Sequence, residues 1–202
     1  FRNLAKNSTY SFINISGLSV GLACSILILL WVTHELSFDN FHPNANRVYQ
    51  LWINGTYDGT VNSFQTVPYQ SKDALREESR GIKNTALGGW GTIHLLTVGD
   101  KKINSKGQIV SEEYLEIFQF PLIQGASENV LDDPNSIVIT ESTAQVLFGK
   151  TDPVGQLITI DNDKEVKVTG VLKDIPGNSS IQFNFLLPVN LFLNEGWVQE
   201  GI

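Results

Sequence analysis

The chain has 202 residues, of which 42% are hydrophobic, and this is enough for one large or two small globular domains. It carries 21 acidic and 14 basic residues, and the net charge of −7 argues against binding to nucleic acid or to an anionic lipid surface. A single cysteine, Cys24, excludes a disulfide framework and a cysteine metal site within the chain. The sequence neither begins with Met nor contains one, so we expect a fragment of a longer gene product.

Residues 7–33 form the longest apolar stretch, and none of them carries a charged side chain. A helix needs about 20 apolar residues to cross the hydrocarbon core of a bilayer, where it satisfies its own backbone polar groups. The stretch therefore predicts one transmembrane helix from about Phe12 to Val32. A cleaved signal peptide is the alternative, but the apolar run is long and no small-residue cleavage site follows it. A buried core helix fits less well, because such helices are rarely uncharged over this length.

Charged residues on either side of the span predict its orientation. Arg2 and Lys6 precede it, whereas Glu35 follows it and the next basic residue is Arg47. Basic residues remain on the cytoplasmic side, so the N-terminus is predicted inside and the remaining domain outside. The first six residues combine apolar and basic side chains, which suits an interfacial helix on the inner leaflet.

Small residues recur on one face of the predicted span. Gly17, Gly21 and Ser25 are spaced four apart, and such spacing lets a second helix approach closely. We predict that this face packs against another membrane helix.

The segment after the span is predicted to continue the helix out of the membrane. Glu35 and Asp39 share one helix face, and Phe38 and Phe41 provide apolar anchors. Pro43 is expected to stop the helix, because a residue before proline avoids the helical conformation. A helix from Phe12 to Phe41 would link the membrane rigidly to the outer domain, and these four residues are the predicted coupling residues.

The first part of the outer domain has the pattern of a βαβ unit. Residues 47–53 alternate as a strand does, and residues 82–88 resemble a returning strand. Between them, residues 68–79 predict a helix that is capped by Thr66 and followed by Gly81. Asn54-Gly55 and Asp58-Gly59 are turn signals.

From Thr92 onward, short strands and short helices alternate. Residues 94–98 and 103–110 are predicted to form a hairpin or an edge pair, and 156–160 forms a hairpin with 165–172; further strands are predicted over 136–139 and 181–188. Ser111 is expected to cap a helix over 112–118, and Thr140 a helix over 141–148 that Gly149 ends. The fold class is therefore α+β, with a β-rich part inserted into an α/β part.

Four patterns resemble chemical motifs without the context that those motifs require. They are Gly17-Leu-Ser-Val-Gly21, Gly149-Lys150-Thr151, the alternating acids Asp161, Asp163 and Glu165, and the cluster of His34, Glu35, Asp39 and His42. The first lies in the predicted span, the second lacks the first glycine of a phosphate-binding loop, and the third lacks the Gly and Glu of a calcium loop. The fourth is interpreted as a solvated helix end rather than a metal site. We therefore predict no catalytic, cofactor-binding or metal-binding residue.

Two stretches of the sequence resemble a known family. The first contains Arg2-Asn-Leu-Ala-Lys-Asn7, Gly17-Leu-Ser-Val-Gly21, His34-Glu-Leu-Ser-Phe-Asp-Asn-Phe-His42 and Arg47-Val-Tyr49. The second contains Ser136-Ile-Val-Ile-Thr-Glu-Ser-Thr-Ala144, Leu147-Phe-Gly149, Asp152-Pro-Val-Gly-Gln156 and Val168-Thr-Gly-Val171. Together they resemble the MacB/FtsX-like permease subunits of ABC transporters, in the form typical of Bacteroidota.

The resemblance implies a transmembrane helix followed by an extracytoplasmic domain with a βαβ porter-like part and an inserted β-rich sabre-like part. The expected boundaries are 1–43 for the interfacial segment and transmembrane helix, 44–91 for the first porter-like half, 92–175 for the sabre-like part, and 176–202 for the start of the truncated second porter-like half.

The resemblance also implies a function and partners. Such a permease pairs with a second permease, identical or paralogous, and engages a separate cytoplasmic ATPase that binds ATP and Mg²⁺. It lies in the bacterial inner membrane and exports a substrate or transmits motion to its periplasmic domain, where an adaptor or substrate protein is a further partner. The chain itself is then not an enzyme.

A single-pass membrane sensor with an extracytoplasmic ligand-binding domain is the alternative, because residues 1–202 of such a protein would have the same physical features. Three further apolar spans after residue 202 would indicate a permease, and a signalling module would indicate a sensor. A membrane-tethered enzyme has no supporting constellation of residues.

Overall fold

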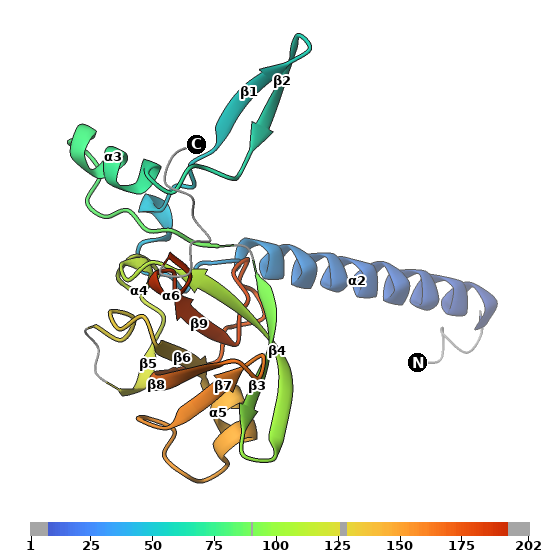
Figure 1. The fold of residues 1–202 in the computed structure, drawn as a ribbon. Helices are drawn as coiled ribbons and strands as arrows, with labels where there is room; N and C mark the ends of the chain where they lie inside the picture. Colours follow the sequence, from blue (N-terminus) through green and yellow to red (C-terminus); the bar gives the residue numbers. More distant parts are fainter. Residues whose placement is uncertain (1–7, 90, 126–128, 194–202) are drawn as a thin grey trace. The chain divides into compact units, whose positions relative to one another are not determined.

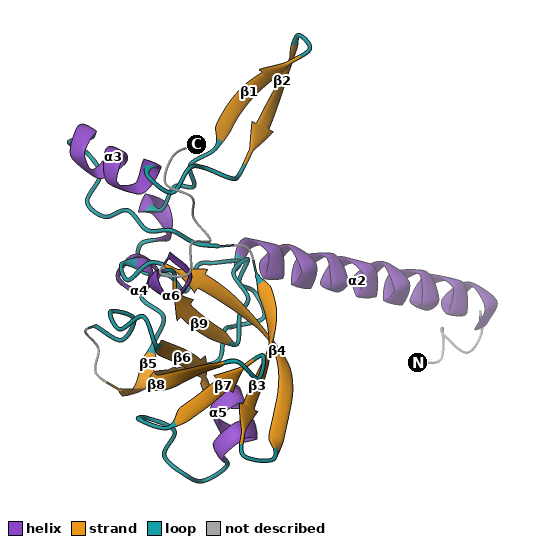
Figure 2. Cartoon of the chain, in the orientation of Figure 1, coloured by secondary structure: helices purple, strands orange, loops and turns teal. Residues whose placement is uncertain are grey.

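A computed structural model describes residues 8–89, 91–125 and 129–193 of the chain (Figure 1). The chain divides into two compact units, residues 1–41 and residues 42–202. Among the described residues, one long helix lies in the first unit, and the short helices and the strands lie in the second (Figure 2). This arrangement confirms the predicted α+β class, with one N-terminal apolar helix followed by a β-rich domain.

The predicted apolar helix is confirmed, and it extends beyond the predicted span of residues 12–32 at both ends. Helix α2 covers Ser8–Leu36, and its apolar side chains are exposed throughout. An exposed apolar surface of this length is unfavourable in water and favourable in a bilayer.

The prediction that this helix continues to Phe41 is wrong. Backbone N–H groups after Leu36 bond to carbonyls three residues earlier, as in tight turns, and Asp39 has a left-handed φ of 55°. The side chains of Ser37 and Asn40 also donate to carbonyls of the last helical turn, which stops further helix formation. The helix therefore ends seven residues before Pro43 and without its help.

Strands β3 to β9 form one sheet that closes on itself. Their bounds are β3 Thr92–Val98, β4 Lys101–Val110, β5 Leu122–Gly125, β6 Ser136–Thr140, β7 Leu157–Ile160, β8 Lys164–Leu172 and β9 Phe185–Pro188. The hydrogen-bonded order is β5-β8-β6-β9-β4-β3-β7, and β7 also pairs with β8. Six strands thus form a closed barrel, and β5 pairs with the part of β8 that β7 leaves open.

Two pairings in the barrel are parallel, namely β4 with β9 and β6 with β8. Strand β9 lies between β6 and β4, so residues from near the end of the described chain complete the sheet formed by earlier residues. The expected boundaries of the sabre-like part, at residues 91 and 175, stay a prediction. The closure of the barrel by β9, which follows residue 175, was not predicted.

The barrel interior is the hydrophobic core of the molecule. Core side chains that are at most 2% exposed include Leu96, Ile137, Ile139, Leu147, Ile158, Val166, Val168, Phe185 and Leu187. Each such side chain contributes about 1.5–3 kcal/mol by leaving water. Helix α5, Glu141–Phe148, adds Ala144 and Leu147 to this cluster.

Phe185 occupies its place in the barrel because the residue beside it is a glycine. Gly107 on β4 pairs with Phe185 on β9, and a Cβ at Gly107 would lie 2.1 Å from the Phe185 ring. Any larger residue at 107 would displace this fully buried ring.

The predicted βαβ unit in the first part of the outer domain is wrong. Residues 48–52 are not a strand, and the strands there form an antiparallel hairpin of β1, Ile53–Tyr57, and β2, Thr60–Phe64. Residues 82–88 contain only an isolated bridge between Gly88 and Val110.

The helix predicted over residues 68–79 is present but shorter: helix α3 covers Ser71–Glu78. Thr66 does not cap it.

The hairpins, the helices and Gly149 in the later part agree better with the prediction. Both predicted hairpins form, as β3–β4 and β7–β8, and α5 has the predicted bounds with Gly149 at a φ of 67°. Helix α4, Tyr114–Phe118, begins two residues late, and α6 covers Asn190–Leu193.

Thr140 is the N-cap residue of α5 as predicted, but its side chain does not bond to a helix N–H, and the prediction that Ser111 caps α4 is wrong because Glu113 holds that position. The Ser111 hydroxyl accepts from the Leu87 N–H, and the Thr140 hydroxyl bonds to the Thr143 hydroxyl instead of a helix N–H.

Candidate functional site: the apolar helix and the contacts of the outer domain

Helix α2 has the chemistry of a membrane-crossing segment. Residues 9–36 form an apolar helix of 28 residues with a mean hydropathy of 2.3 over its most apolar part. The hydroxyls of Ser16, Ser25 and Thr33 donate at 2.9–3.1 Å to carbonyls three or four residues earlier in the same helix. The hydrogen bonds of these hydroxyl groups are therefore satisfied within the helix. A hydrocarbon environment requires this, because it contains no water to bond to them.

The three small residues predicted to pack against another helix lie on one face of α2. A Cβ added at Gly17 or at Gly21 would meet no atom within 4 Å, so both positions leave room for a neighbouring backbone. The Ser25 hydroxyl bonds to the Gly21 carbonyl, which keeps that side chain close to the helix. Packing against a partner helix stays a prediction.

The four predicted coupling residues lie around the end of α2. Glu35 is in its last turn, whereas Phe38, Asp39 and Phe41 lie in the turns that follow. The ring of Phe38 packs edge-on against His34 at 5.3 Å between centroids. Their role in coupling stays a prediction, and Phe38, Asp39 and Phe41 belong to turns rather than to the helix.

The interpretation of His42 as part of a solvated helix end is wrong. Its side chain is buried, its Nδ1 lies 2.7 Å from the Phe118 carbonyl oxygen, and its ring packs edge-on against Phe118 and Phe120. Within residues 8–89, 91–125 and 129–193, no group of three or more His, Cys, Asp or Glu side chains is placed to hold a metal ion. His42 therefore helps to fix the start of the outer unit onto helix α4.

An ion pair attaches helix α3 to the rest of its unit. Lys72 Nζ lies 2.7 Å from Glu113 Oε1, and both side chains are less than 15% exposed. Burial alone would raise the pKa of Glu113, but the hydrogen bonds from Lys72 and Ser111 lower it by more. The pKa of Glu113 therefore lies below its ordinary value. Arg76 lies 4.0 Å from the same oxygen. None of the residues of α3 is buried, so apolar packing holds this helix only weakly. The Lys72–Glu113 pair is therefore an important attachment of α3 to its unit.

A second polar contact joins β3 to the turn between β7 and β8. His94 Nδ1 lies 2.6 Å from Asp161 Oδ2, and the Leu95 N–H donates to Asp161 Oδ1. Burial alone would raise the pKa of Asp161, but the His94 and Leu95 hydrogen bonds outweigh it, so the pKa lies below its ordinary value. The sequence did not predict this pair or the Lys72–Glu113 pair, because the partners lie 67 and 41 residues apart and no local pattern connects them.

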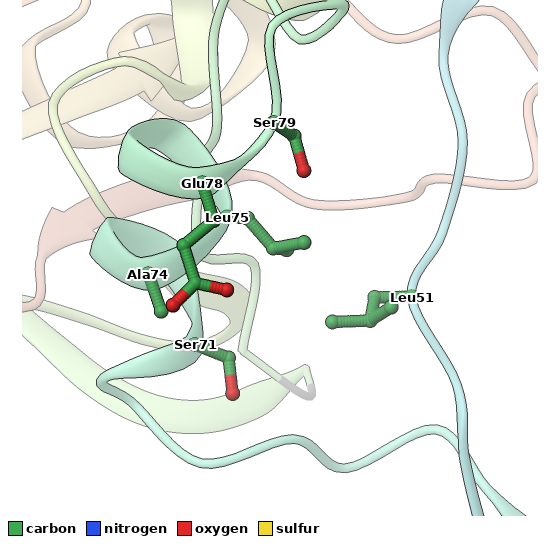
Figure 3. A pocket seen from close by; sticks show the side chains of 6 residues that line it. All are labelled: Leu51, Ser71, Ala74, Leu75, Glu78 and Ser79. Carbon is green, nitrogen blue, oxygen red and sulfur yellow. The ribbon is translucent and has the colours of Figure 1, made fainter.

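Two shallow hollows lie on the surface of the outer unit. One, of about 240 Å³, lies between Leu51 and helix α3 and is lined by Ser71, Ala74, Leu75, Glu78 and Ser79 (Figure 3). The other, of about 340 Å³, is lined by Asn129, Val130, Val154, Gly155, Lys167, Val168 and Thr169. Each is lined by a single ionisable side chain, Glu78 or Lys167, so neither brings together an acid and a base for catalysis.

Residues 11–200 match the family model of the MacB-like periplasmic core domain. The chain belongs to this family. The resemblance seen in the two sequence stretches is thereby confirmed for the MacB-like domain, and with helix α2 it gives a membrane protein with an extracytoplasmic domain.

Solved structures agree with this family. A domain from a Porphyromonas gingivalis protein described as a permease is 28% identical, with a TM-score of 0.53, and the match covers 63% of this chain and 59% of that one. The periplasmic region of MacB from Actinobacillus actinomycetemcomitans has the same fold, with 21% identity, a TM-score of 0.55, and coverage of 71% and 66%. The extracellular domain of the noncanonic ABC-type transporter YknZ from Gram-positive bacteria has 18% identity, a TM-score of 0.52, and coverage of 63% and 65%.

The match spans about three fifths to two thirds of the length of these solved MacB-like domains. A search of curated proteins finds no match.

Proposed function

We propose that this chain is the first membrane span and the periplasmic domain of an ABC-transporter permease subunit. The subunit couples ATP hydrolysis by a separate cytoplasmic ATPase to movement of its periplasmic domain, in export or in mechanotransmission. The observation that carries this proposal is that residues 11–200 match the MacB-like periplasmic core domain and that this match begins within an exposed apolar helix of 28 residues, long enough to cross a membrane.

The proposed location is the bacterial inner membrane, with the N-terminus in the cytoplasm and the barrel in the periplasm. Arg2 and Lys6 before the span, and the lack of any Lys or Arg between its end and Arg47, support this orientation. ATP and Mg²⁺ bind to the partner ATPase, and this chain binds neither.

Coupling in this proposal passes along α2. Gly17, Gly21 and Ser25 contact a neighbouring span, belonging to the same permease or to a second, identical or paralogous one. Motion of α2 then reaches the outer unit through the turns that hold Phe38 and Asp39. A coupling free energy of about 1–3 kcal/mol is typical of two linked sites and is within reach of one packed helix.

Beyond the membrane, the barrel and the hairpin β1–β2 offer surfaces to a periplasmic partner. An adaptor protein or a protein substrate is the partner class that fits a permease whose outer domain moves.

The experiment is purification of the full-length protein in a mild detergent, followed by mass spectrometry of the proteins that accompany it. We expect a stoichiometric ABC ATPase subunit that is lost when the protein is unfolded before capture. A known MacB-like permease purified under the same conditions serves as the control. If that permease retains its ATPase and this protein brings none, the proposal is contradicted and the single-pass sensor becomes the better account.

A further inference from the structure

Two aromatic rings that each carry a hydrogen-bond donor lie near the two ends of α2. Tyr10 is in the first turn of the helix, and Trp31 lies five residues before its last residue, Leu36. The rings are 76% and 63% exposed, so both are available to the surroundings of the helix. Each combines an apolar body with one polar group, the Tyr10 hydroxyl or the Trp31 indole N–H, and such rings favour the headgroup level of a bilayer.

The separation of the two rings fits the thickness of a bilayer. Tyr10 and Trp31 are 21 residues apart in one uninterrupted helix. At a rise of about 1.5 Å per residue, this separation is about 32 Å along the helix axis. The hydrocarbon core of a bilayer is about 30 Å thick, so α2 can place one ring at each of its boundaries with little tilt.

The nearest charged residues mark the same two boundaries independently. Lys6 lies four residues before Tyr10, Glu35 lies four residues after Trp31, and the sequence between them contains no Lys, Arg, Asp or Glu. Four helical residues cover about 6 Å, which places both charges within the hydrated headgroup layers. A shift of α2 by more than about one turn in either direction would bring Lys6 or Glu35 into hydrocarbon, where a charge is costly.

This placement also locates the outer end of the helix. Leu36 lies five residues beyond Trp31, which is about 7–8 Å along the axis. A headgroup layer is about 5–8 Å thick, so α2 ends where the headgroups meet water. The turns that hold Phe38 and Asp39 then begin at the surface of the bilayer.

We propose that Tyr10 and Trp31 bind the headgroup layers of the two leaflets and hold α2 at one fixed depth, with its last turn at the bilayer surface. The partner of these two rings is the phospholipid bilayer itself. A helix that is held at both ends in this way resists sliding along the bilayer normal. The proposal rests on the membrane span of the proposed function, and it does not depend on the ATPase.

The test measures the depth of single positions of α2 in the full-length protein, reconstituted into vesicles of phosphatidylethanolamine and phosphatidylglycerol. A spin label is attached in turn to Ser11→Cys, Leu22→Cys and Val32→Cys, in a background without other cysteines. Collisions of the label with oxygen, which concentrates in hydrocarbon, and with a nickel chelate, which stays in water, report its depth. We expect the label at position 22 to be deepest, and the labels at positions 11 and 32 to lie at similar, shallow depths near the two boundaries.

The anchoring role is tested by Trp31→Leu in vesicles with longer acyl chains. Leucine is a good helix former and is stable in hydrocarbon, so the helix should persist while its outer end sinks. Nickel collisions at position 32 should then fall several-fold, whereas the protein with Trp31 should keep position 32 at the boundary. The matched control is Phe12→Leu, which removes a ring without a hydrogen-bonding atom and should leave the depth at position 32 unchanged.

Two kinds of result would overturn the proposal, and they differ in what else they affect. If position 22 is deep but positions 11 and 32 lie at clearly unequal depths, or if Trp31→Leu leaves the depth at position 32 unchanged, the anchoring is contradicted and the span stands. If position 22 is as accessible to the nickel chelate as a label in water, the span and the proposed function are contradicted as well.

Discussion

At the scale of single residues, Asp161 connects the turn between β7 and β8 to strand β3. Its N–H donates to the Leu95 carbonyl, and its carboxylate bonds to the Leu95 N–H and to His94. It does so from a left-handed backbone conformation with a φ of 51°, which Asp and Asn tolerate better than most residues. The side chain is half-exposed, so its contribution to stability is modest.

Replacing Asp161 with Asn should lower the thermal midpoint of the full-length protein at neutral pH by a few degrees, because the ionised partner of His94 is lost. The folded pKa of Asp161 lies below its ordinary value of 3.8, so its stabilisation is present above pH 3.8 and disappears as the pH falls through the folded pKa. Melting curves of the two proteins should therefore begin to converge as the pH falls below 3.8, and their difference should vanish once the pH is below the folded pKa of Asp161. A difference that does not shrink at all below pH 3.8, as far down as the fold survives, would show that the charge on Asp161 is irrelevant.

Gly107 tests how tightly the barrel is packed. An alanine at this position would place its Cβ against the fully buried Phe185 ring, and overpacking of this kind costs about 1–3 kcal/mol or more. We expect a large drop in the thermal midpoint for Gly107→Ala. The matched control is Gly81→Ala, where a Cβ meets no atom within 4 Å, and it should leave the midpoint nearly unchanged. Equal effects of the two substitutions would contradict the packing described for β4 and β9.

At the scale of elements, local signals predicted the later part of the chain well. Thr140 and Gly149 bracket α5, and positive φ at Asp161 and Asn162 makes the turn of the β7–β8 hairpin. The earlier part was predicted less well, because Asn54-Gly55 has the sequence of a turn yet lies inside β1.

The turn forms at Asp58-Gly59 instead, where both residues have positive φ. Gly55 is needed in the strand to leave room for the rings of Tyr57 and Phe64. A local pattern cannot distinguish these two uses of glycine.

The end of α2 could not be predicted from hydrophobicity or from Pro43. Polar side chains after Leu36 bond to the final carbonyls of the helix, and this competition decides where the helix ends. The element proposed to transmit motion is therefore a helix followed by turns.

The small-residue face of α2 provides a prediction about coupling. Gly21→Leu should leave ATP hydrolysis by the partner ATPase measurable and should abolish its link to movement of the outer domain, because the larger side chain separates the packed helices. Val20→Leu, on a different face of α2, is the control and should have little effect. The measurement compares ATPase rate with an outer-domain distance reporter in reconstituted protein. Coupling that survives Gly21→Leu would exclude this face as the helix contact.

At the scale of the whole molecule, the closed barrel depends on pairings between distant parts of the sequence. Gly107 pairs with Phe185 and Ile137 with Val168, both in parallel. Periodicity predicted most strands individually but could not predict which strands would be neighbours. The family could be predicted from the sequence because its short motifs are local. Several of these motifs lie in the apolar helix, near α5 and along β8.

The central claim is that ATP hydrolysis moves the periplasmic unit relative to the span. The most direct test is a distance measurement between spin labels at Leu36→Cys, at the end of α2, and at Asp100→Cys, in the turn between β3 and β4. The background is Cys24→Ser, which removes the chain's one cysteine. The complex is reconstituted with its ATPase, with one labelled copy. The account predicts that the distance distribution changes when ATP is trapped with vanadate and returns when nucleotide is removed. Identical distributions in a complex that hydrolyses ATP would contradict it.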